Sequence, residues 1–201
     1  MSRLLAALSL CITIQIQAQQ LQFGNIRPDS NYSCKGVLNL DNKSIDSLYG
    51  LRNLCQSKNA LEIRLGILYS PLSVFHLVVL TYNGQGWSAK RMEGSLPNIL
   101  YGNKNDRNID SFNLVPKVSF DSIFQTLKAN NVFTLGNQKD LKPDGLVDDG
   151  AFYFLLFKAG NKFGGYSFNN PGAYKQAYKE MPQFSNYAMI KTVFISWLVK
   201  K

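Results

Sequence analysis

Few residues of this chain have the types and spacing that a catalytic site requires. His76 is the only histidine, so it would have to act alone as an imidazole base. It stands between Phe75 and Leu77 in an apolar run, which is typical of a partly buried histidine on a strand. The sequence has no G-x-S-x-G elbow, no H-E-x-x-H, no phosphate-binding glycine loop and no C-x-x-C. It therefore indicates no named catalytic mechanism, no metal site and no cofactor.

Aspartates gather in one glycine-containing loop, as Asp140, Asp144, Asp148 and Asp149. Oxygen-rich loops can hold Ca²⁺, but the alternating ligands and closing glutamate of an EF-hand are missing here. Aspartate and glycine are also ordinary turn residues, and we favour that interpretation. Asp148 and Asp149 could instead serve as acid and base on a glycan or ester, although neighbouring strand residues point to opposite faces. A secreted hydrolase stays the alternative, and it needs a further carboxylate from elsewhere in the chain.

Positive charge is the strongest functional signal in the sequence. The chain has 22 Lys and Arg against 13 Asp and Glu, a formal net charge of +9. Such a surface attracts anionic partners. The basic residues are spread along the chain, which is also typical of a generally soluble surface. On or beside predicted strands, we single out four cations and one aromatic residue as a candidate binding patch: Arg64, Lys90, Lys158, Lys162 and Trp87.

The amino terminus has the composition of a cleavable export signal. Arg3 precedes an apolar run from Leu4 to Ile14, and a polar stretch around Ala18 follows. The run would span only about 16 Å as a helix, against about 30 Å for a hydrocarbon core, and no later segment is long enough to span one. We predict that residues 1–18 are removed and that residues 19–201 form one globular domain in the periplasm or outside the cell.

Two cysteines, Cys34 and Cys55, would remain in the processed chain. In an oxidising compartment such a pair favours a disulfide. This bond would close a loop of about twenty residues and contribute on the order of 3 kcal/mol in the chain-entropy model. Two buried thiols are the alternative, because sequence spacing does not show whether the two α-carbons lie within bonding distance.

Hydrophobic periodicity predicts the elements that position these residues. A period of two predicts a strand with one solvated face over 61–69, and an apolar run predicts a central strand over 74–82. An edge-like strand follows at 87–92, and 151–158 and 163–168 are predicted to form a hairpin around Gly160. Apolar residues at helical spacing predict helices over 45–54, from Ser119 to Asn130, from Asn170 until Pro182 stops it, and through 190–197.

These elements define a fold class. Strands joined by short turns pair antiparallel, and helices with one apolar stripe must bury it against the sheet. We therefore predict an α+β fold in which an antiparallel sheet of about five strands is packed on one face by helices.

Five short motifs together resemble a group of known sequences. They are Glu62-Ile63-Arg64, Trp87-Ser88-Ala89, Asn131-Val132-Phe133-Thr134-Leu135, Asp149-Gly150-x-x-Tyr153 and Tyr166-Ser167-Phe168-Asn169-Asn170-Pro171. This combination is similar to that of uncharacterised exported α+β proteins of Gram-negative bacteria, and it covers most of the processed chain. The resemblance implies the fold and the compartment, and it carries no activity and no functional residue.

Two hypotheses for the function follow. The first is a non-catalytic binding domain that holds an anionic envelope component, an extracellular polymer or a partner protein. The second is the carboxylate hydrolase. The export signal, the positive charge and the missing catalytic residues favour the first, and the predicted compartment makes nucleic acid an unexpected partner.

Overall fold

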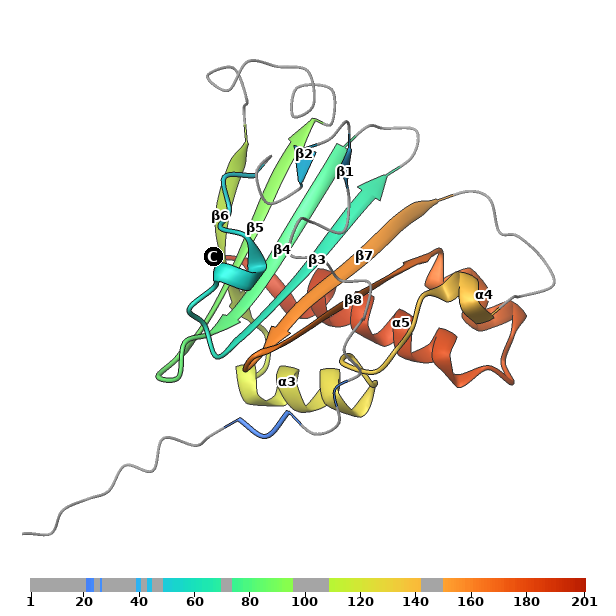
Figure 1. The fold of residues 1–201 in the computed structure, drawn as a ribbon. Helices are drawn as coiled ribbons and strands as arrows, with labels where there is room; N and C mark the ends of the chain where they lie inside the picture. The colour runs from blue at the N-terminus through green and yellow to red at the C-terminus, as the bar shows by residue number, and fades with distance from the viewer. Residues whose placement is uncertain are drawn as a thin grey trace, which may run out of the picture.

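A seven-stranded antiparallel sheet is the main feature of the computed structural model (Figure 1). The structure describes residues 21–23, 26, 39–40, 43–44, 49–69, 74–95, 109–141 and 150–201. The strand order is β8-β7-β3-β4-β5-β6-β9, and every neighbouring pair is antiparallel. The strands are β3 (Leu61–Tyr69), β4 (Val74–Tyr82), β5 (Trp87–Ser95), β6 (Asp110–Pro116), β7 (Ala151–Ala159), β8 (Lys162–Asn169) and β9 (Leu198–Lys200). Two short strands, β1 (Asn39–Leu40) and β2 (Lys43–Ser44), pair with each other.

Three α-helices of the described residues pack on one face of the sheet, and α5 passes behind the strands in Figure 1. They are α3 (Phe120–Ala129), α4 (Pro171–Ala177) and α5 (Pro182–Thr192). A π-helical turn, η3 (Val193–Trp197), continues α5, and two 3₁₀ helices are η1 (Leu54–Gln56) and η2 (Gln138–Leu141). We call the covered side the helix face: it carries the odd-numbered residues of β3, β5 and β7 and the even-numbered residues of β4, β6 and β8. The other side is the front face.

The larger hydrophobic core lies on the helix face. Leu61, Ile63 and Leu65 from the sheet are fully buried against helix side chains such as Phe124 and Phe184. Burying one such side chain contributes about 1.5–3 kcal/mol, so this layer supplies most of the driving force for folding. A smaller core lies on the front face, where Tyr49 and Leu54, which precede β3, pack against the sheet. Its buried members are Tyr49, Leu54, Phe75, Leu77, Val79, Met92, Phe154 and Leu156.

The α+β class is confirmed, but the predicted number of about five strands is wrong. β6 begins with the polar residues Asp110, Ser111 and Asn113 interleaved with only one apolar side chain, and β9 has only three residues. The segment at 87–92 is no edge strand, since β5 pairs with both β4 and β6. The predicted solvated face of 61–69 is also wrong: Glu62 and Arg64 are buried, because residues 49–59 pack beside this strand.

The helix predictions hold only in part. Ser119 caps α3 as expected, and its Oγ accepts a hydrogen bond of 3.1 Å from the Ser122 backbone N–H. The predicted helix over 45–54 is not present in its described part, where only the short η1 forms. Pro182 begins α5 instead of ending the preceding helix, because the first helical turn does not need the N–H that proline lacks.

Several predictions concern residues outside the described part of the chain. These are the signal peptide over 1–18, Cys34, Asp144, Asp148 and Asp149. Cys55 lies in η1, and its disulfide with Cys34 stays a prediction. Among the described helices, none combines the length and apolar character needed to cross a bilayer.

Candidate functional site

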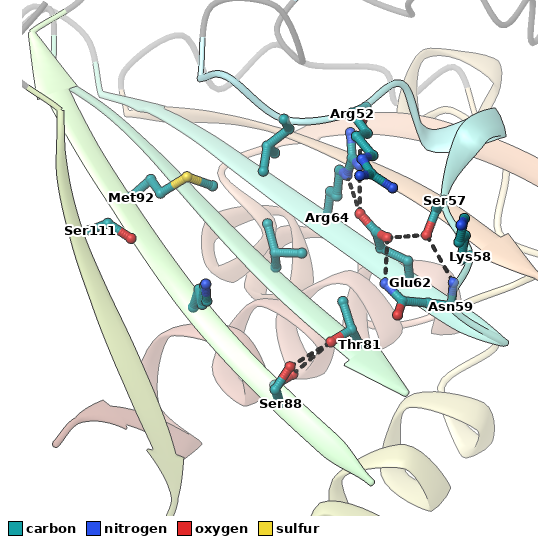
Figure 2. A pocket seen from close by; sticks show the side chains of 13 residues that line it. Arg52, Ser57, Lys58, Asn59, Glu62, Arg64, Thr81, Ser88, Met92 and Ser111 are labelled. Carbon is teal, nitrogen blue, oxygen red and sulfur yellow. Dashed lines mark hydrogen bonds and ion pairs between the residues drawn. The ribbon is translucent and has the colours of Figure 1, made fainter. Parts of the chain in front are cut away.

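A polar hollow lies in the front face of the sheet (Figure 2). It has a volume of about 400 Å³ and opens between residues 51–59 and strands β3 to β6. We call residues 51–59 the wall segment and the strands beneath it the floor. The lining residues are Leu51, Arg52, Ser57, Lys58, Asn59, Glu62, Arg64, Val79, Thr81, Ser88, Lys90, Met92 and Ser111.

The strand register brings the floor residues together. Successive side chains along a strand point to opposite faces of the sheet. Val79 and Thr81 of β4 therefore share the front face with Ser88 and Lys90 of β5. Thr81 lies directly opposite Ser88, and their hydroxyl oxygens are hydrogen-bonded at 2.6 Å. Ser111 adds a third hydroxyl from β6. The floor therefore offers three hydroxyl groups beside its charged residues.

A buried ion pair stands at the base of the wall segment. Glu62 and Arg64 are two residues apart on β3, so both point to the front face, where they are 5% and 2% exposed. The Glu62 Oε1 atom accepts from Arg64 Nε at 2.7 Å and lies 2.5 Å from Nη2. Arg64 is thus committed to Glu62 and is not a free cation for a ligand, because a buried charge requires its partner.

The same pair holds the wall segment in place. Arg64 Nη2 donates a 2.9 Å hydrogen bond to the Arg52 carbonyl. The other carboxylate oxygen of Glu62 accepts from Ser57 Oγ at 2.5 Å and from Asn59 Nδ2 at 2.9 Å, contacts that are visible as dashed lines in Figure 2. Such charge-assisted bonds are about twice as strong as neutral ones. The wall segment is therefore fixed to the sheet through one carboxylate and one guanidinium group.

Three cations of the hollow are exposed: Arg52 and Lys58 on the wall segment and Lys90 on the floor. The structure gives none of their side chains an ion-pair partner among the described residues. Among the described lining residues there are four cations and one carboxylate, that of Glu62, which Arg64 neutralises. The hollow consequently presents net positive charge to solvent, and a concave site concentrates that field on an approaching anion.

The groups in the hollow suit binding more than catalysis. Both oxygens of Glu62 already accept hydrogen bonds, so this carboxylate is poorly placed to move a proton. The lining holds no histidine, and the serine hydroxyls have no adjacent base that would activate them among the described residues. Cations, hydroxyl donors and an amide remain, and these are the groups that hold an anionic or hydroxylated ligand.

The structure brings together only part of the predicted binding patch. Arg64 and Lys90 line the hollow, and Lys158 lies on the same face, where its Nζ donates a 2.5 Å hydrogen bond to the Asn59 carbonyl. Lys162 and Trp87 belong to the helix face. Lys162 is exposed at the end of the β7–β8 hairpin.

Trp87 packs between the sheet and a helix. Its ring is stacked with Phe120 at a centroid distance of 6.0 Å and packs on Phe124, and its Nε1 donates to Asp121 Oδ1 at 3.1 Å. These contacts join β5 to α3 and leave the tryptophan away from the hollow. An amphipathic ring with one polar atom is often used in this way between a strand and a helix.

Sequence reasoning missed Arg52, Lys58 and the three floor hydroxyls. Arg52 lies in the segment 45–54 expected to be a helix, and Lys58 lies between that segment and the first long strand, so nothing in the periodicity placed them over the sheet. Thr81 and Ser88 carried a usable signal, since each is polar within or at the start of a strand. Their pairing depends on the hairpin register, which the turn geometry sets.

His76 belongs to a separate group of charges on the helix face. Arg91 Nη2 lies 2.5 Å from His76 Nδ1, and Arg91 Nε lies 2.6 Å from Glu93 Oε1, which Lys200 also approaches at 3.4 Å. Burial and the positive charge of Arg91 lower the pKa of His76 below its usual 6.5. No group of three or more His, Cys, Asp or Glu side chains able to hold a metal ion occurs among the described residues.

Comparison of the chain with protein-family models, with curated proteins and with solved structures found no match. The similarity to exported proteins of Gram-negative bacteria therefore stays a prediction, and the function is argued from the hollow itself.

Proposed function

We propose that this protein is a non-catalytic binding domain and that the hollow in its front face holds an anionic ligand. One observation carries the proposal. In the part of the chain that the structure describes, three exposed cations line a hydroxyl-bearing hollow, and its one carboxylate is neutralised by a buried arginine. Each exposed cation attracts a ligand anion by about 1 kcal/mol at 4 Å in water, and by more where the wall segment excludes solvent.

The predicted export signal suggests where the ligand is found. A domain outside the cytoplasm meets envelope components and extracellular polymers, many of which are acidic. A volume of about 400 Å³ is within the usual range for a small-molecule site, so the hollow fits a small ligand or one segment of a polymer better than a flat protein surface. The hydrolase alternative rests on Asp148 or Asp149, both outside the described residues, and no described contact favours it.

Retention on immobilised anions tests this proposal. The purified protein is applied to a panel of polyanions and envelope glycans and eluted with a salt gradient. We expect one ligand to retain it at about 0.15 M salt, where exposed charges are already well screened. Weak elution from every anion at low salt would contradict a built site and indicate generic charge.

Two variants with the same change in net charge locate the site. Lys90→Met removes the floor cation, and we expect it to elute at a lower salt concentration than wild type. Lys162→Met removes another exposed lysine, from the helix face, and serves as the matched control. If both variants elute alike, the hollow is not the binding site.

A further inference from the structure

We infer that the ligand of this hollow carries two anionic groups held apart by a hydroxylated spacer, as in a short acidic oligosaccharide. The inference rests on the proposed function and adds the chemical class of the ligand. It follows from three features of the hollow: the distance between its cations, its volume and the groups that lie between them.

The cations stand on two opposite sides. Arg64, whose side chain reaches the Arg52 carbonyl, is on β3, and Lys90 is two strands away on β5, with Val79 of β4 between them. Neighbouring strands lie about 4.8 Å apart, so the backbone at Lys90 is about 10 Å from that of Arg64. Figure 2 shows Arg52 and Lys58 on the wall side and the floor strands across from them. The backbone positions that carry the two cationic sides are therefore about two strand spacings apart, which favours a ligand with an anionic group at each end of this span.

The volume supports a ligand of several units. One water molecule occupies about 30 Å³ of liquid, and an inorganic oxyanion is only a few times larger. The hollow measures about 400 Å³, so a phosphate or sulfate ion would leave most of it to solvent. A ligand that fills the space and meets both cationic sides must extend across the floor.

The groups between the two sides fit hydroxylated carbon. The hydroxyls of Thr81, Ser88 and Ser111 can exchange hydrogen bonds with ligand hydroxyl groups. Val79 and Met92, both buried, supply apolar contact for the C–H faces of a sugar ring. The described lining includes no aromatic side chain, so the stacking platform that nucleic-acid bases use is missing from this set. An acidic peptide would offer fewer hydroxyl groups to the floor.

Calorimetric titration with oligomers of one sugar acid tests the inference. The probes are galacturonic acid and its dimer and trimer, with neutral cellotriose and tetraglutamate for comparison. We expect the trimer to bind at least tenfold more tightly than the monomer and cellotriose to bind far more weakly than the trimer. Lys90→Met and the double variant Arg52→Met/Lys58→Met each remove one cationic side, and each should reduce trimer affinity to about that of the monomer. Lys162→Met should leave it unchanged, and circular dichroism checks that each variant is folded.

The outcomes separate the inference from the proposed function. Equal affinity for monomer and trimer would overturn the two-anion ligand while leaving an anion site in place. Tighter binding of tetraglutamate than of any sugar acid would overturn the glycan class in favour of an acidic peptide. Failure of every anionic probe, together with no retention on the polyanion panel, would overturn both.

Discussion

The buried ion pair beneath the hollow should dominate the stability of the front face. Glu62 and Arg64 are 5% and 2% exposed, and replacing Glu62 removes the buried carboxylate that forms this ion pair with Arg64. Breaking such a pair costs about 3–5 kcal/mol. Ser57 and Asn59 also lose their shared acceptor. We therefore expect Glu62→Leu to lower the free energy of unfolding by about 4 kcal/mol, a large part of the about 5–15 kcal/mol of a typical domain.

A double variant separates the charge effect from simple loss of packing. Glu62→Leu/Arg64→Met removes both charges and keeps most of the buried volume, and such replacements are often neutral or stabilising. We expect the double variant to be more stable than Glu62→Leu alone and within about 2 kcal/mol of wild type, the remainder reflecting the three lost contacts to Arg52, Ser57 and Asn59 of the wall segment.

Urea unfolding followed by tryptophan fluorescence measures these differences through the linear dependence of free energy on denaturant. Glu180→Leu alters an exposed carboxylate and is the matched control, with an expected change within about 0.5 kcal/mol. A loss below about 1 kcal/mol for Glu62→Leu, or a double variant as unstable as the sum of its single variants, would refute the reasoning.

Three further predictions follow from individual contacts. The Tyr166 hydroxyl is buried and has no hydrogen-bond partner among the described residues. Tyr166→Phe should therefore raise the free energy of unfolding by about 1 kcal/mol and the melting temperature by a few degrees, and a clear decrease in the calorimetric melting temperature would contradict this. A Cβ at Gly66 would lie 1.8 Å from the Phe154 ring, so Gly66→Ala should cost about 1–3 kcal/mol in urea unfolding, and an unchanged midpoint would show that the ring moves freely. The pKa of His76 is lower in the folded protein, so the unfolded chain binds the proton more tightly and stability should fall as pH decreases through about 6.5. His76→Gln, which can still accept from Arg91, should reduce this slope between about pH 7.5 and 5.5, and a slope equal to that of wild type would exclude His76 as its source.

The central part of the fold could be predicted because its periodicity is local. The alternation over 61–69, the apolar run over 74–82 and the Ser119 cap each depend on neighbouring residues only, and all three correspond to observed elements. β6 and β9 could not be predicted in this way. Their pairing is fixed by strands and a helix distant in sequence, and their own residues are polar or few.

The candidate site shows the same limit. Glu62 and Arg64 stand two residues apart on a strand, so the sequence alone could have placed them on one face as a pair. The sequence prediction instead treated Arg64 as a ligand contact, which its burial against Glu62 does not favour. The association of Lys90 with Lys58 depends on the β4–β5 register and on the path of the wall segment, and neither leaves a local pattern.

The location of the ligand is the central claim, and backbone amide NMR tests it most directly. The ligand selected by the polyanion panel is titrated into isotope-labelled protein while the amide signals are followed. If the ligand binds in the hollow, the largest changes in amide chemical shift occur at Ser88, Lys90 and Ser111 and in the wall segment, with little change in α3 and α5. Shifts that centre on the helix face, or that spread evenly over the basic surface, would contradict it.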